Sequence, residues 1–182
     1  MRDVCARALA SAAMIVALAI PASAQQSVTL TDTSQTTTLT ATVSEQARVT
    51  VPAGVTFSVG NVSASTAASA ASVTVDSIVL ATATKQLSVS LQANAAAFTP
   101  PVVGATTWTA GDVTWNAATW TNATGATGTL SSAAYSTVAT CTADAADCST
   151  TDLIFTLAAK STVKRAGSHT LVVTWKFESI GS

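Results

Sequence analysis

Apolar and polar residues alternate in short runs along much of this chain of 182 residues. The last run is the clearest, and one face of the strand that it predicts would carry His169, Leu171, Val173, Trp175 and Phe177. Successive side chains of a β-strand point to opposite faces, so a period of two predicts a strand with one buried face. Val and Thr are abundant throughout, and both suit a pleated, half-buried surface. The pattern predicts an all-β protein.

Similar runs occur upstream, separated by turn residues. We expect strands over residues 47–51, 55–59, 73–80, 87–91, 129–130, 135–139 and 153–157. Residues 63–72 are almost entirely Ser, Ala and Thr and predict a loop, with a short helix as the alternative, while residues 122–128 resemble a turn. About nine or ten short strands at this spacing favour an immunoglobulin-like antiparallel β-sandwich.

The first 24 residues have the layout of a secretory signal peptide. Arg2 and Arg7 precede an apolar run over residues 8–20, and small residues end the segment at Ala24. The run is too short to span a bilayer, and no second long apolar run follows, so we expect no membrane insertion after cleavage. The expected organisation is a signal peptide (1–24), an extended N-terminal arm or first strand (25–46) and a β-sandwich domain (47–182).

The N-terminal arm has an alternating core, with Leu39, Ala41 and Val43 on one side and threonines on the other. An extended segment of this kind can complete a sheet through main-chain hydrogen bonds. It can pair within its own chain, which is the simpler expectation, or with a neighbouring subunit, and the residues leave both open.

Two cysteines remain once Cys5 leaves with the signal peptide. Cys141 and Cys148 form an even pair in a chain expected to reach an oxidising compartment. A disulfide would close a short loop and stabilise the fold by roughly 2.5 kcal/mol on a chain-entropy estimate. A metal or redox pair would need further Cys or nearby His ligands, which the sequence lacks. We expect a plain disulfide.

Charge and motifs argue against several classes of protein. The net charge is −1 and only 9% of residues are charged, so no basic surface for nucleic acid is expected. The chain has no Walker, dinucleotide-binding or H-E-x-x-H motif. Its single histidine, His169, has no accompanying nucleophile elbow, and a structural or exposed role is expected. We expect no enzyme activity, no cofactor and no metal.

Carboxylates offer two alternatives to that expectation. Paired carboxylates can hydrolyse glycosides, but only Asp112 lies in an aromatic-rich region of the sequence. Asp144, Asp147 and Asp152, around the cysteine pair, could share a calcium ion, although their spacing lacks the D-x-D-x-D-G pattern. Placement in turns and on the surface is the stronger expectation for all four.

Three of the four tryptophans, Trp108, Trp115 and Trp120, lie between residues 107 and 120. Indole rings on the outward face of a sandwich would form a platform for sugar rings or a protein partner, whereas inward rings would fill the core. Neighbouring Thr and Ala residues leave the direction of the rings open. Core packing is the first expectation, and a ligand platform of exposed tryptophans is the alternative.

The C-terminal stretch from Arg165 to Phe177, RAGSHTLVVTWKF, resembles the ending of secreted spore-coat-U-like and pilin-like bacterial proteins. The VTWKF portion, together with the region of Trp108, also resembles the WxL cell-wall-binding domain. The first resemblance implies a β-rich surface protein that assembles by strand exchange, and the second implies attachment to peptidoglycan. The late cysteine pair departs from the pilin pattern, which has an early disulfide, and Thr107-Trp108-Thr109-Ala110 stands where WxL has Trp-x-Leu.

These observations predict a non-catalytic structural or adhesive protein of the bacterial cell surface, secreted or periplasmic. Assembly through strand pairing of its N-terminal arm is one of the two arrangements that the sequence leaves open for the arm. Its expected partners are further copies of itself, other surface proteins or cell-wall polysaccharide. The alternative is a carbohydrate- or cell-wall-binding module that uses exposed tryptophans.

Overall fold

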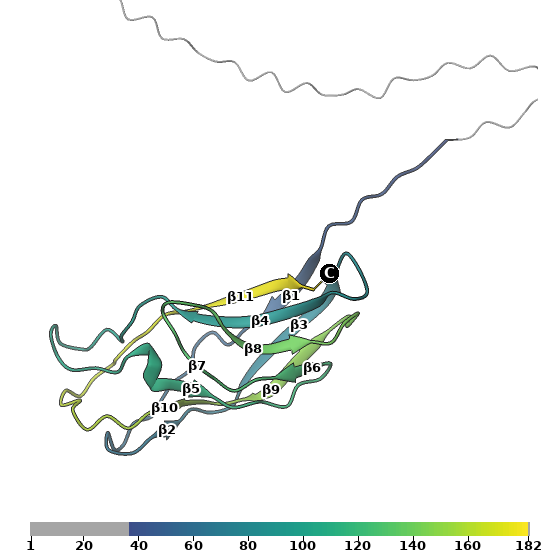
Figure 1. The fold of residues 1–182 in the computed structure, drawn as a ribbon. Coiled ribbons are helices and arrows are strands. Elements are labelled where there is room, and N and C mark those ends of the chain that lie inside the picture. Colours follow the sequence, from purple (N-terminus) through teal and green to yellow (C-terminus); the bar gives the residue numbers. More distant parts are fainter. Residues whose placement is uncertain (1–36, 182) are drawn as a thin grey trace, which may run out of the picture. The chain divides into compact units, whose positions relative to one another are not determined.

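Antiparallel β-sheets make up most of the regular structure in residues 37–181, the part of the chain that this computed structural model describes (Figure 1). The strands are β1 (Gln46–Thr50), β2 (Thr66–Ala67), β3 (Ala71–Val79), β4 (Gln86–Ala93), β5 (Val113–Trp115), β6 (Ala123–Gly125), β7 (Gly128–Thr129), β8 (Ser136–Cys141), β9 (Cys148–Leu153), β10 (Phe155–Leu157) and β11 (Val173–Ile180). The described residues contain no α-helix, and η1 (Ala110–Asp112) is a single 3₁₀ turn. The prediction of an all-β protein is confirmed.

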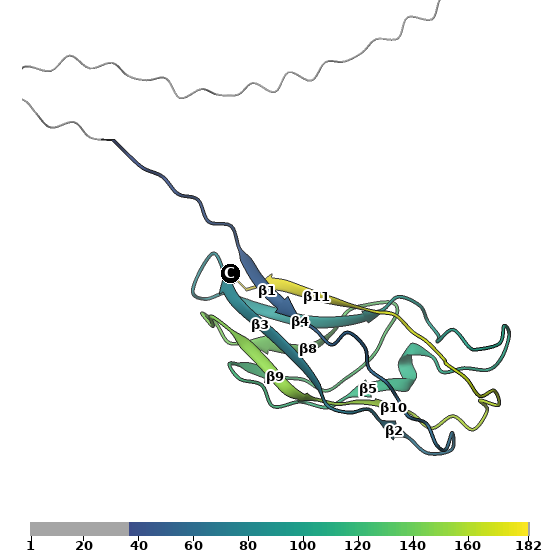
Figure 2. The ribbon, with the colours of Figure 1, turned by 180° about the vertical axis from the view of Figure 1, so that it is seen from behind.

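Hydrogen bonding arranges the strands in three sheets with the orders β1-β3-β9, β2-β10-β5-β7 and β11-β4-β8-β6. The chain runs from β2 into β3 and from β9 into β10 with only short breaks, and β2 pairs with β10 as β3 pairs with β9. The first two sheets therefore form one bent layer, and the third sheet lies opposite it (Figure 2). This arrangement is consistent with a β-sandwich, and the immunoglobulin-like topology stays a prediction.

The hydrophobic core lies between the layers. Val73 and Val75 of β3 face Val89 and Leu91 of β4 within one buried cluster, and none of the four has exposed surface. Both strands were expected from their alternation, and both form. Their apolar residues meet because a period of two places every second side chain on the same face.

Strand β4 is more deeply buried than its alternation predicts. Ser88 and Ser90 should face solvent, yet both are buried. The register with β11 places Glu178 beside Ser88 and Lys176 beside Ser90. Because β4 lies between β11 and β8, the longer neighbouring side chains cover the short serines.

The two layers are joined along one side by a disulfide. Cys141 at the end of β8 bonds to Cys148 at the start of β9, and both residues are buried. The expected disulfide is therefore confirmed. Beside it, an isolated bridge pairs Thr121 with Ser149, and the Asn122 amide donates a hydrogen bond to Asp147 (2.8 Å). These contacts close the side of the sandwich where β6, β8 and β9 lie.

Several local expectations are wrong. Residues 122–128 contain β6 and the start of β7 instead of a turn, and residues 55–59 form no strand. The final strand begins only at Val173, because its partner β4 ends at Ala93, opposite Val173 in the register. Residues 63–72 hold β2 and the start of β3, and the short helix considered there is absent.

The expected signal peptide, residues 1–24, lies outside the described residues, as does the arm as far as residue 36. Residues 37–45 have no regular secondary structure, and β1 begins at Gln46, the last residue assigned to the arm. The side chains of Leu39 and Val43 are 91% and 69% exposed, so the alternating face seen in the sequence is not buried.

Candidate functional site

The side of the sandwich opposite the disulfide is open. There β1 pairs only with β3 and β11 pairs only with β4, so each strand has one edge without a hydrogen-bonded strand among the described residues. Figures 1 and 2 both show β1 and β11 next to each other. Ser179 of β11 donates a hydrogen bond to Glu45, just before β1 (3.3 Å). Edges of this kind are templates for pairing with a further strand.

The chain after β1 continues the unpaired edge. Residues 55–59 alternate as a strand does, with Val55, Phe57 and Val59 half-buried and Thr56 and Ser58 exposed. Within the described chain, the one backbone hydrogen bond of residues 52–59 is local, from Val59 N to Phe57 O (3.1 Å). This segment has the side-chain pattern of a strand, and residues 37–181 offer it no strand partner.

A narrow apolar groove separates this segment from the start of β11. Its cavity has a volume of about 160 Å³. Val55 and Phe57 line one side, and Leu171, Val173 and Trp175 line the other. The floor is formed by core residues of both layers, namely Leu91, Phe98, Val113, Leu130 and Phe155. The groove therefore opens directly onto the hydrophobic core.

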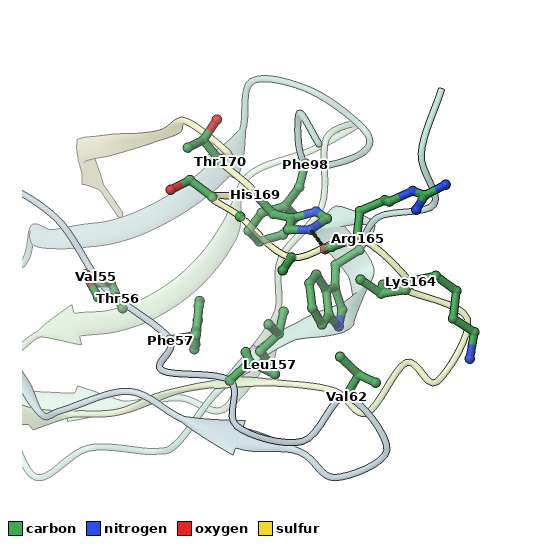
Figure 3. Close-up of a pocket in the computed structure, with 16 residues that line it drawn as sticks. Val55, Thr56, Phe57, Val62, Phe98, Leu157, Lys164, Arg165, His169 and Thr170 are labelled. Atoms are coloured by element: carbon green, nitrogen blue, oxygen red, sulfur yellow. Dashed lines mark hydrogen bonds between the residues drawn. The ribbon is translucent and has the colours of Figure 1, made fainter. Parts of the chain in front are cut away.

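A larger pocket of about 680 Å³ lies beside the groove (Figure 3). Val55, Phe57 and Phe98 line both cavities, so the two are neighbours. The pocket surface is about equally polar and apolar: Val62, Trp108 and Leu157 belong to its apolar part, while residues 164–170 form a mostly polar rim. The amino-acid sequence did not predict this pocket, because the walls of the pocket come from segments far apart in the chain.

His169 holds the rim of the pocket in place. Its Nδ1 lies 2.7 Å from Thr107 Oγ1, its Nε2 lies 3.2 Å from the Arg165 carbonyl oxygen, and its ring meets Trp108 edge-on at 5.1 Å between centroids. With the proton on Nε2, the ring donates to the carbonyl and accepts from the hydroxyl. Both nitrogens are then used in loop contacts, and no carboxylate of the described chain hydrogen-bonds to the ring.

Two cations on the pocket rim lack ionic partners. Lys164 and Arg165 are exposed and form no ion pair with any residue between 37 and 181. The other four described cations are all paired, as Arg48–Asp76, Lys85–Glu45, Lys160–Asp112 and Lys176–Glu178. Figure 3 shows Lys164 and Arg165 at the end of the pocket away from Val55. The sequence marked this pair only as part of a turn.

The tryptophan platform considered from the sequence is wrong, because Trp108, Trp115 and Trp120 are only 4%, 3% and 8% exposed. The Trp108 and Trp115 indoles donate to the carbonyls of Ala158 (2.9 Å) and Ala126 (3.0 Å), which allows the rings to be buried at little cost. The Thr and Ala residues next to these tryptophans fit either face of a strand, so the sequence could not show that the rings point inward. All three rings fill the core, and only Trp108 reaches a pocket wall.

Asp112 and the aspartates around the disulfide are the carboxylates that the sequence singled out. In residues 37–181 no group of three His, Cys, Asp or Glu side chains is arranged to hold a metal ion, so the calcium site considered at Asp144, Asp147 and Asp152 is not formed. Asp112 accepts hydrogen bonds from the Thr109 backbone N–H (2.7 Å) and hydroxyl (2.9 Å), and it pairs with Lys160 (2.7 Å). These contacts hold the η1 turn against the loop after β10.

The carboxylate of Asp112 predicts an acid-sensitive contribution to stability. Burial raises its pKa, but hydrogen bonds from Lys160 and Thr109 outweigh burial and hold the pKa below the ordinary value of 3.8. Because the folded pKa is depressed, the stabilisation is complete above the unfolded pKa and is lost as pH falls through the folded one. Asp112→Asn should lower the free energy of unfolding at pH 7 by less than about 1 kcal/mol, since the pair is partly exposed.

Urea unfolding of both proteins at pH 7 and at pH 2.5 measures this effect. The difference between wild type and Asp112→Asn is expected to shrink toward zero at the lower pH. A difference that stays constant or grows on acidification would contradict the assigned role of the carboxylate.

Comparisons of the chain with protein-family models, with curated proteins and with solved structures give no match. None of the helical structure in residues 37–181 is long and apolar enough to cross a bilayer. The candidate site therefore rests on the geometry alone, which is an apolar groove between residues 52–57 and the start of β11, beside a larger pocket with two cations on its rim.

Proposed function

We propose that this protein is a non-catalytic structural or adhesive component of the bacterial cell surface, and that its subunits associate by strand pairing. The open groove between residues 52–57 and the start of β11 carries the proposal. It combines unpaired backbone along residues 52–59 with access to the apolar core. A strand laid in it would satisfy main-chain donors and acceptors and would cover apolar side chains at the same time.

Export supports the same proposal. The N-terminal sequence has the layout of a signal peptide, and the Cys141–Cys148 disulfide suits an oxidising compartment outside the cytoplasm. An exported chain with an unpaired edge next to its core needs a partner strand or tends to self-associate. The N-terminal arm is rich in Thr and has an alternating section, so it is suited to be that strand.

Deletion of residues 25–43 from the mature protein tests the proposal. We expect purified full-length mature protein to form oligomers, because each groove accepts the arm of another subunit, and we expect the deleted protein to be monomeric. Sedimentation velocity across a range of protein concentrations measures both. The deletion ends before Glu45, so the contacts of Glu45 with Lys85 and Ser179 remain. Wild-type protein that stays monomeric at high concentration would overturn the proposal.

A further inference from the structure

We infer that the larger pocket beside the groove receives residues 28–32 of a second copy, with Leu30 in the pocket and Asp32 at Lys164 and Arg165. The inference rests on the proposed function and adds to it the donor segment, its position and a charge contact that would set its register. It combines the chemistry of the pocket with that of the arm sequence.

The pocket combines an apolar wall with a polar rim that carries two cations. Its wall is formed by side chains such as Phe57, Trp108, Leu157 and Val163, and the Trp108 and His169 ring nitrogens are already hydrogen-bonded. An apolar side chain can therefore pack against this wall without leaving either ring nitrogen unpaired. Lys164 and Arg165 are the two cations of the described chain without an ionic partner, so the end of the pocket would favour an anion.

The arm contains one segment with the matching pattern. In an extended conformation, Val28, Leu30 and Asp32 lie on one face of the chain and the threonines between them lie on the other. Asp32 is the only charged residue between residues 25 and 44. A segment with two apolar side chains followed by a carboxylate is complementary to a pocket that has an apolar wall and two cations on its rim.

The other alternating part of the arm fits this pocket less well. Leu39, Ala41 and Val43 have no charged residue among them that could meet the cations. They also lie close to Glu45, which is held by Lys85, by the Ala81 backbone N–H and by Ser179. Asp32 precedes Glu45 by 13 residues, which reach about 43 Å when extended. That length allows residues 28–32 to reach the pocket of a neighbouring subunit.

Charge reversal tests the contact between Asp32 and the two cations. Two charge-reversed proteins are compared with wild type: Asp32→Lys in the arm, and the double variant Lys164→Glu/Arg165→Glu in the pocket. Each should weaken association at low salt by at least about tenfold, as measured by sedimentation equilibrium. Thr38→Lys places the same new charge elsewhere on the arm and should change association little. The exposed positions of Lys164 and Arg165 make these variants compatible with folding, which near-UV circular dichroism checks.

Mixing the two charge-reversed proteins shows whether the donor is a second copy. The lysine introduced at position 32 of one protein should bind the glutamates introduced at positions 164 and 165 of the other. The mixture should therefore form mixed oligomers, whereas each protein alone stays mainly monomeric. Recovery of association on mixing supports docking between copies. Failure to recover on mixing overturns the inference.

A leucine comparison tests which part of the arm enters the pocket. Leu30→Ser should reduce association strongly and Leu39→Ser should not. Loss of association in Leu39→Ser with normal association in Leu30→Ser overturns the inference. If none of the substitutions alters assembly while deletion of residues 25–43 abolishes it, the pocket assignment fails and strand pairing by the arm still stands. If the deletion also has no effect, the proposed function fails as well.

Discussion

Replacement of Trp115 by alanine is expected to lower the free energy of unfolding by about 3–5 kcal/mol. The Trp115 indole is 3% exposed, lies edge-on against Phe155 with 6.3 Å between ring centroids, and donates to the Ala126 carbonyl (3.0 Å). Truncation would leave a cavity between β5, β7 and β10 and would remove the hydrogen-bond donor from that carbonyl. Urea unfolding followed by circular dichroism, with the disulfide kept oxidised, measures the loss.

A surface aromatic residue provides the matched control for Trp115. Tyr135 is 41% exposed, and Tyr135→Ala removes only a partly exposed ring that lies near the Lys176 ammonium. Its effect should be below about 1 kcal/mol. Similar losses in the two variants would show that the Trp115 ring is not part of the core.

The second large effect is expected at Gly125, where even a methyl group has no room. A Cβ at this position would overlap the Ala118 carbonyl oxygen and would lie 2.9 Å from Trp120 Cδ1. The carbonyl belongs to the backbone and the Trp120 ring is buried, so neither can move easily. Gly125→Ala should therefore destabilise the protein by about 1–3 kcal/mol through overpacking.

Gly60→Ala is the control for Gly125→Ala, because a Cβ at Gly60 would meet nothing within 4 Å. There the substitution should be neutral or slightly stabilising, since alanine reduces the entropy of the unfolded chain. Thermal or urea unfolding of both variants measures the difference. Equal stabilities would mean that β6 does not pack against the Trp120 ring as the structure shows.

Strand positions were predictable where alternation is long and uninterrupted. The runs in β3, β4 and β11 were identified because each places large apolar residues on one face over five or more residues. The segment containing β6 and β7 was missed because its glycines and Asn122 are typical of turns. In the structure Gly125 and Gly128 instead allow strands to approach the buried rings of Trp120 and Trp115 closely.

The candidate site was only partly predictable. The sequence showed the alternation of residues 55–59 and the adjacent cations Lys164 and Arg165. It could not show that residues 52–59 lack a neighbouring strand, because the position of every other strand decides that. The direction of the tryptophans was undecided for the same reason, since their Thr and Ala neighbours fit either face.

The sequence by itself determined what depends on neighbouring residues, namely the strand character of the alternating runs. It also determined the disulfide, since Cys141 and Cys148 were the only remaining pair. Only the tertiary structure decided which strands are edges, which side is closed by the disulfide, and where a groove reaches the core. The physical reason is that side-chain alternation is a local property of an extended backbone, whereas an unpaired edge is defined by contacts among residues far apart in the chain.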